Sequence, residues 1–290
     1  MRLRARIIAL SFGLLFSLAS VAAQPGPQRW VSAGGALSEW VSAMGAQPRL
    51  VGVDTTSQHP ESLRQLPSIG YQRQLSAEGI LSLRPDILVG TEEMGPPPVL
   101  AEIRRAGVTV EAFSSQPTLA AVQANLQHLG QLLADPTRAA QLFDSYQQRL
   151  QAQQVWVTKA RARQAAPGVL LLLGHTGAKP MVGGRGTAAD WLLEQAGGRN
   201  LANNDGYKNF SNEVLVALNP DVIVFADRSL SGEAARQALL KENPALAATR
   251  AFRDGRLIQL DPTLLVGGLG PRVPDALQTL SRALYPNADE

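Results

Sequence analysis

The stretch SAEGILSLRPDILV at residues 76–89 recurs 135 residues later as SNEVLVALNPDVIV at residues 211–224, and each copy lies shortly after a Gly-Tyr pair. The two copies match at a serine, a glutamate, a leucine and a Pro-Asp pair. A local unit used twice, at a spacing the size of a small domain, predicts two similar lobes. The cleft between two such lobes is a natural place for a ligand.

Each copy predicts a short helix, a turn and a buried strand. Ser76 and Ser211 are good N-cap residues, and a glutamate follows each in the first helical turn, where the helix dipole favours negative charge. Each helix ends before a proline, which cannot donate the next hydrogen bond. The apolar runs 87–89 and 222–225 do not alternate with polar residues, as is typical of buried parallel strands. Chance recurrence of a Leu-x-Pro-Asp turn explains one copy more easily than two.

The rest of the chain alternates strand and helix signals, which favours two α/β lobes with parallel-type sheets flanked by helices. Residues 136–164 have no internal proline or glycine and carry apolar residues at helical spacing. They predict one long helix of about 28 residues and about 42 Å, which can join the lobes. The other expected elements are strands at 30–32, 49–53, 87–90, 108–113, 169–173, 222–225 and 257–260, and helices at 36–44, 98–106, 187–195 and 273–284.

The first 23 residues resemble a secretory signal peptide, with a basic start, a largely apolar run over 7–21 and small residues at the end. The alternative is a membrane anchor, but the apolar run is short for a span of about 20 residues. We therefore expect cleavage after Ala23. The mature chain is expected to consist of an N-terminal lobe (24–136), a connecting helix (137–165) and a C-terminal lobe (166–290).

Charge and cysteine content exclude several functions. The formal net charge of +3 equals the three arginines of the leader, so the mature chain is neutral and nucleic-acid binding has no electrostatic basis. The chain has no cysteine, which excludes disulfides, thiol catalysis and thiolate metal sites. An exported chain without cysteine fits the bacterial periplasm, where the fold must be stable on its core alone.

An exported chain of two α/β lobes joined by one long helix resembles the periplasmic binding proteins with a helical hinge. These serve uptake transporters for haem, siderophores, vitamin B12 and some metals. The motifs VGVDTTS at 51–57, LPSIGYQRQLSAEGI at 66–80 and GGLGPR at 267–272 look like the haem-binding branch of that family. The resemblance covers essentially the whole mature chain and is strongest over residues 49–90. It implies a protein that binds haem between its lobes and delivers it to an inner-membrane ABC transporter permease.

In that branch the tyrosine of a Gly-Tyr-x-Arg segment ligates the haem iron, and it matches Tyr71, with Arg73 two positions on. Ferric iron accepts a phenolate oxygen, but a phenol with a pKa near 10 needs help from the metal and a nearby cation. If residues 71–73 are extended, their alternate side chains share a face, which places the Arg73 guanidinium beside the phenol. Arg73 can also pair with a haem propionate. The alternative is a half-buried loop tyrosine beside a solvated arginine.

The second lobe offers two further candidate haem contacts. Tyr207 is the positional partner of Tyr71 in the second repeat, so it is expected either to face the cleft and stack on a porphyrin or to serve in packing. His175 follows the first predicted strand of this lobe. The resemblance makes it a candidate second axial ligand, and a loop histidine bonded to backbone is the alternative. We expect no ligand role for His59 or His128.

Glu78 and Glu213 occupy the same position in the two repeats. In related binding proteins one surface glutamate on each lobe meets arginines of the permease, and these two residues resemble them. Two charged anchors would let the transporter recognise the closed, loaded form. The alternative is that each carboxylate only stabilises the N-terminus of its helix, and both roles are compatible.

The leading hypothesis is a monomeric periplasmic protein that carries haem to an ABC importer and depends indirectly on an outer-membrane haem receptor system. A ferric siderophore or vitamin B12 binder of the same fold is the nearest alternative, whereas three scattered histidines make a poor divalent-metal site. An exported α/β enzyme is the alternative from another class, but the sequence has no Gly-x-Ser-x-Gly elbow, Walker loop or His-Glu-x-x-His helix. The glycine-rich run 183–187 is weak evidence for an anion contact. A structural or signalling domain would leave the long helix and the paired glutamates unexplained.

Overall fold

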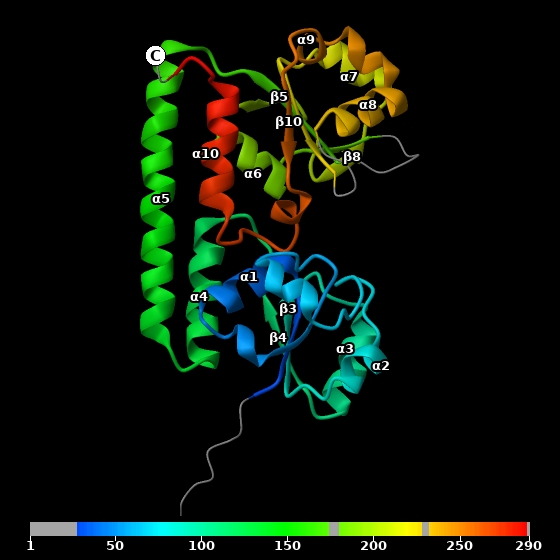
Figure 1. Cartoon of the computed structure of the whole chain (residues 1–290), viewed down its shortest axis with the longest axis vertical. Coiled ribbons are helices and arrows are strands. Elements are labelled where there is room, and N and C mark those ends of the chain that lie inside the picture. Colours follow the sequence, from blue (N-terminus) through cyan, green and yellow to red (C-terminus); the bar gives the residue numbers. More distant parts are fainter. Residues whose placement is uncertain (1–27, 174–179, 228–231, 289–290) are drawn as a thin grey trace, which may run out of the picture.

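The computed structural model describes residues 28–173, 180–227 and 232–288. These residues form two α/β lobes, one above the other in Figure 1, with a long helix along both. The expected fold class is therefore confirmed. Among the described residues, no helix is both long and apolar enough to span a bilayer.

The N-terminal lobe contains a four-stranded sheet with the order β2-β1-β3-β4, in which every neighbouring pair is parallel. Strand β3 is buried along its whole length, as its unbroken apolar run predicts. The elements of this lobe are β1 (Trp30–Ala33), α1 (Gly35–Ala43), β2 (Leu50–Val53), α2 (Ala77–Ser82), β3 (Ile87–Thr91), α3 (Pro97–Arg105), β4 (Thr109–Phe113) and α4 (Leu119–Leu132), with 3₁₀ turns at Gln47–Arg49 and Glu61–Gln65.

The C-terminal lobe contains a mixed sheet with the order β10-β9-β5-β6-β8, and β7 also pairs with β5. The pairs β10–β9, β9–β5 and β5–β7 are parallel, whereas the pairs β5–β6 and β6–β8 are antiparallel. The expected parallel-type sheet therefore applies to only part of this lobe. Its helices are α6 (Ala188–Gln195), α7 (Asn212–Leu218), α8 (Gly232–Glu242), α9 (Arg250–Arg253) and α10 (Val273–Leu284). Its strands are β5 (Gly168–Leu173), β6 (Met181–Gly183), β7 (Arg199–Asn200), β8 (Tyr207–Asn209), β9 (Val222–Ala226) and β10 (Leu257–Leu260), and 3₁₀ turns lie at Pro244–Ala248 and Pro262–Leu265.

The sequence repeat is also a structural repeat, as predicted. The hydroxyl of Ser76 accepts a hydrogen bond from the Gly79 amide, and that of Ser211 accepts one from the Val214 amide, so both serines cap their helices. Each Pro-Asp turn then binds the start of the neighbouring strand. Asp86 accepts a hydrogen bond from the Arg29 amide at 2.7 Å, before β1, and Asp221 accepts one from the first amide of β5, also at 2.7 Å. The repeated aspartate therefore fixes the register of two central strands in each lobe.

Helix α5 (Pro136–Arg163) links the lobes as one unbroken helix of 28 residues. In Figure 1 it lies beside α4 in its first half and beside α10 in its second half. The Arg138 guanidinium donates to the Ala43 carbonyl in the N-terminal lobe, and Arg161 donates to the Gly197 carbonyl in the C-terminal lobe. The helix therefore connects both lobes through packing as well as through the chain.

The GGLGPR segment at 267–272 joins the C-terminal lobe to helix α1 of the N-terminal lobe. The Trp40 indole donates to the Leu269 carbonyl at 2.9 Å and packs edge-on against Tyr146 of α5. A Cβ atom at Gly270 would lie 3.4 Å from Ala36, so glycine allows this close approach. The buried apolar core is continuous through this contact.

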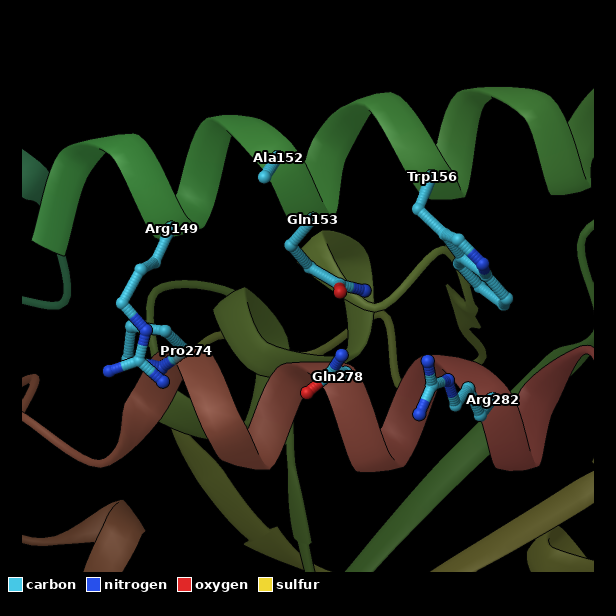
Figure 2. Close-up of a pocket in the computed structure, with 7 residues that line it drawn as sticks. All are labelled: Arg149, Ala152, Gln153, Trp156, Pro274, Gln278 and Arg282. Carbon is cyan, nitrogen blue, oxygen red and sulfur yellow. The ribbon is translucent and has the colours of Figure 1, made fainter.

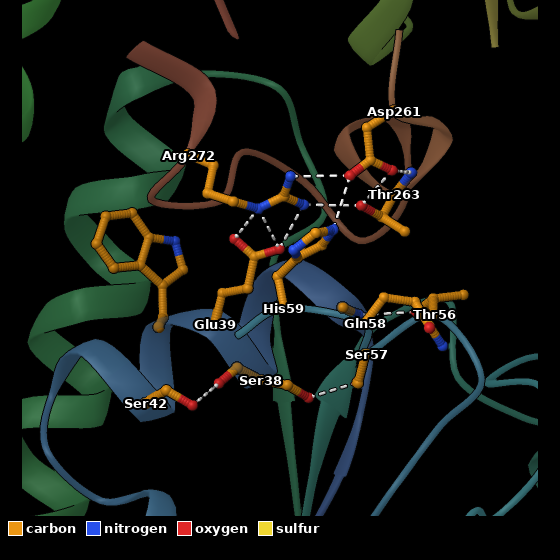
Figure 3. A network of polar contacts seen from close by, with 12 residues as sticks. Ser38, Glu39, Ser42, Thr56, Ser57, Gln58, His59, Asp261, Thr263 and Arg272 are labelled. Atoms are coloured by element: carbon orange, nitrogen blue, oxygen red, sulfur yellow. Dashed lines mark hydrogen bonds and ion pairs between the residues drawn. The ribbon is translucent and has the colours of Figure 1, made fainter. Parts of the chain in front are cut away.

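A network of ion pairs crosses the same interface (Figure 3). Arg272 donates to both oxygens of Glu39 at 2.7–3.0 Å and to Asp261 at 2.9 Å, and His59 Nε2 lies 2.9 Å from Asp261 Oδ2. Glu39 is only 5% exposed, and burial raises its pKa although Arg272 opposes the shift. This carboxylate depends on its partner because a buried unpaired charge is costly.

Replacing Arg272 with alanine should therefore destabilise the fold by about 3–5 kcal/mol, because Glu39 would remain buried without its partner. Urea unfolding followed by circular dichroism measures this change. The control is Arg185→Ala, which removes an exposed ion pair with Asp205 and should cost no more than about 1 kcal/mol. Equal losses of stability in the two variants would contradict the conclusion that Arg272 and Glu39 form the main ion pair between the lobes.

Candidate functional site between the lobes

Tyr71 and Arg73 lie on a tight turn of the N-terminal lobe. The Gln74 amide donates to the Tyr71 carbonyl at 2.8 Å, which closes the turn over residues 71–74. The expectation of an extended segment is therefore wrong, because this local hydrogen bond reverses the chain. Tyr71 is 37% exposed, and the intervening Gln72 is completely buried, so the turn holds the phenol at the surface of the lobe.

Arg73 nevertheless lies near the Tyr71 phenol. Its guanidinium forms an ion pair with Glu93 at 2.8 Å. The hydrogen bond to Glu93 is the main cause that raises the pKa of Arg73, and electrostatic attraction to Tyr71 and Tyr207 adds to it. The turn therefore leaves the guanidinium within electrostatic range of the phenol, although the two residues are not alternate positions on an extended strand.

Tyr207 meets this group from the opposite lobe. It begins the antiparallel strand β8 and is 39% exposed. Burial is the main cause that raises the pKa of its phenol, and the Glu93 carboxylate raises this pKa further. Hydrogen bonds with the Thr187 side chain and the Ala189 backbone act in the opposite direction. Arg73 therefore lies within electrostatic range of tyrosines from both lobes, although Tyr207 is 134 positions further along the sequence.

Gly34 and Gly267, one from each lobe, approach each other next to the turn that carries Tyr71. Gly34 has φ +135°, and a Cβ atom there would lie 3.0 Å from the Gln72 Oε1 atom. Gly267 comes from the other lobe, and its Cβ position would be 3.6 Å from the Thr91 side chain. The side-chain oxygens of Gln72 and Thr91 are buried and accept or donate no hydrogen bond within the described residues.

An open cavity of about 600 Å³ also lies between the lobes. Its N-terminal wall follows β2 and its C-terminal wall follows β10, so it opens at the carboxyl ends of parallel strands, where ligands bind in open α/β sheets. It is lined by Thr55, Gln58, His59, Arg64, Asp227, Gln259, Leu260, Asp261, Pro262 and Thr263.

The comparisons with known proteins identify the family. A model of the periplasmic binding protein family matches residues 31–264. The chain belongs to this family.

Two solved structures and one curated sequence illustrate the similarity. A periplasmic heme binding protein from Pseudomonas aeruginosa is 62% identical, with a TM-score of 0.88, over 90% of this chain and 94% of that one. The periplasmic heme-binding protein BhuT, solved in complex with two hemes, is 39% identical, with a TM-score of 0.81, over 90% and 99%. A vitamin B12-binding protein from Vibrio cholerae is 31% identical over 148 residues, half of this chain and 52% of that one.

Three further residues of this periplasmic binding protein were predicted as site residues: His175, Glu78 and Glu213. His175 lies outside the described residues. Glu78 and Glu213 are exposed in the first turns of α2 and α7, one on each lobe. Within the described ranges, no three histidine, aspartate or glutamate side chains gather as a metal site.

Two interactions could not be expected from sequence patterns. His59, for which no role was expected, forms a contact across the interface with Asp261. Glu93 follows a predicted strand as an ordinary surface residue, and only the tertiary contact with Arg73 distinguishes it. Local sequence patterns contain no information about which residues that are distant in the chain will form an ion pair.

Replacing Gly34 with alanine should destabilise this binding protein by about 1–3 kcal/mol, because alanine is strained at this φ and its Cβ would press on Gln72. Thermal unfolding at fixed pH measures the effect. The control is Gly79→Ala within α2, where the added Cβ makes only an ordinary contact with Ser76. That variant should be neutral or more stable by up to about 1 kcal/mol. A Gly34 variant as stable as the wild type would contradict the steric argument.

Proposed function

We propose that this protein binds haem between its two lobes and delivers it in the periplasm to the permease of an ABC importer. The observation that carries the proposal is a pair of partly exposed tyrosines, Tyr71 and Tyr207, one on each lobe and both within electrostatic range of the Arg73 guanidinium. The lobes of the proposal are residues 24–136 and 166–290, with residues 137–165 as the connecting helix and residues 1–23 as the cleaved leader.

The chemistry of this group suits ferric haem. A phenolate is a known axial ligand of haem iron. Because a free phenol is protonated at neutral pH, a nearby guanidinium favours the ionised form that the iron needs. Arg73 is the cation closest in sequence to Tyr71, and its charge is secured by Glu93. We therefore assign Tyr71 as the iron ligand and Arg73 as the group that stabilises its phenolate.

Tyr207 is proposed to cover one face of the porphyrin. Its ring is exposed toward the interface, while its phenol group is tied to the start of α6 through Thr187 and Ala189. An aromatic face held in this way can bury a large apolar area against a flat ligand. His175 is proposed as an additional axial ligand.

Relatives support haem more strongly than other ligands. The two structural relatives described above carry heme in their names, and their similarity extends over nearly the whole chain. The relative named for vitamin B12 matches only half of the chain, and cobalamin therefore remains the second candidate, with a ferric siderophore as a third. An enzyme has no support from the family, which consists of binding proteins.

Glu78 and Glu213 are proposed as the contacts with the permease. They are exposed at equivalent positions of the repeated unit, one on each lobe, so their separation changes when the lobes move. A permease with two basic sites would then distinguish the closed, loaded form from the open form. Each carboxylate also lies at a helix N-terminus, where it is locally stabilised.

Hemin titration of the purified protein should shift the Soret band, and Tyr71→Ala should weaken binding by at least about 100-fold because the iron loses its protein oxygen ligand. Tyr285→Phe is a matched control, because Tyr285 is buried, lies far along the chain and donates to the Gly197 carbonyl. That variant should bind hemin as the wild type does. Competition with cyanocobalamin and a ferric siderophore tests the other candidates, and preferential binding of either would overturn the haem assignment.

The double variant Glu78→Ala/Glu213→Ala should bind hemin normally but reduce transport by about tenfold, because only the permease contact is removed. Haem uptake by proteoliposomes that contain the cognate importer measures this. The control is Glu61→Ala/Glu242→Ala, which removes two exposed carboxylates outside the repeated positions. Equal uptake by both double variants would show that the repeated glutamates serve only their helices.

A further inference from the structure

Two adjacent glutamates follow strand β3 and have different surroundings. Glu92 pairs with the end of the neighbouring strand, since its amide donates to the Phe113 carbonyl and its carboxylate accepts from the Ser115 amide and hydroxyl. Glu93 faces the tyrosine site instead, and its carboxylate lies 2.8 Å from Arg73 Nη2. Only the second of these carboxylates is therefore in a position to influence a bound ligand.

The contact with Arg73 restrains a flexible side chain. The Arg73 side chain is 52% exposed, and a solvated arginine samples many rotamers. Glu93 is less exposed, at 31%, and Gln72 Nε2 lies 3.5 Å from its Oε2 atom. Because Gln72 is completely buried, it supports the carboxylate from within the lobe. The support therefore runs from a buried amide through Glu93 to the guanidinium.

The ion pair also lies within electrostatic range of aromatic side chains from both lobes. Tyr71 and Tyr207 both act on Arg73, and Glu93 acts on Tyr207. The pair is therefore close to the interface between the lobes.

We propose that Glu93 is a positioning residue of the haem site, which holds the Arg73 guanidinium in place through their 2.8 Å ion pair. This inference rests on the proposed function and adds to it a residue that acts through another. Outer-sphere groups of this kind orient a ligand and raise its affinity for the metal.

The test uses the full mature protein and the variants Glu93→Gln, Arg73→Gln and the double variant. Glu93→Gln should weaken hemin binding by about tenfold. If Glu93 acts through Arg73, the double variant should bind hemin no more weakly than Arg73→Gln alone. Glu93→Asp should recover most of the affinity.

Glu92→Gln is the matched control, since it removes the same charge from the adjacent residue, and it should leave hemin affinity unchanged. Unchanged or tighter hemin binding by Glu93→Gln would overturn the proposal, because the carboxylate would then contribute nothing through Arg73. Additive losses in the double variant would overturn it as well. Circular dichroism of each variant verifies that the fold is intact.

A measurement without haem separates this inference from the proposed function. In the haem-free protein, the Arg73 Nη–H signals in ¹⁵N NMR should exchange more rapidly with solvent in Glu93→Gln than in the wild type, because Nη2 is the atom that contacts Glu93. If the wild type binds no hemin, the proposed function fails while these signals still report the ion pair. Identical exchange in the two proteins would overturn the positioning role itself.

Discussion

The ion pair between Arg272 and Glu39 is the constraint on which the arrangement of the two lobes depends. It lies where the GGLGPR segment contacts helix α1, and the Trp40 indole of the same helix donates a hydrogen bond to the Leu269 carbonyl of that segment. Because Glu39 is almost fully buried, the pair is strongly coupled to the packing around it, and neither charge is tolerated alone. Tyr71 and Tyr207, one on each lobe, keep their relative position through this contact and through helix α5.

The residues of the proposed site depend on one another for their chemical properties. Tyr71 is an exposed phenol on a turn, Arg73 is a partly solvated cation, and Tyr207 begins a short antiparallel strand. Ionising the phenol becomes favourable only when a cation and ferric iron are both near. A carrier benefits from such a design, since a ligand site divided between two lobes loses affinity when the lobes separate. The family of the chain and the geometry of the site thus point to the same kind of transport function.

Much of the fold was predictable because its signals are local. The repeated serines, glutamates and Pro-Asp turns predicted α2, β3, α7 and β9, and the run without proline or glycine predicted α5. The antiparallel strands β6 and β8 were not predicted, because they are three residues long and carry little periodicity. The motif predicted Tyr71 and Arg73 as site residues, which stays a prediction, but the turn that carries them depends on a backbone hydrogen bond from Gln74, for which the sequence has no specific signal.

The amino-acid sequence by itself determined the two α/β lobes and the linking helix, since caps, prolines and apolar runs act within a few residues of themselves. Only the tertiary structure decided which distant residues meet. It paired Glu39 with Arg272, His59 with Asp261 and Arg73 with Glu93, and it brought Tyr207 within electrostatic range of Arg73. The physical reason is that charge pairing and burial depend on distance in space, which the whole packed chain sets.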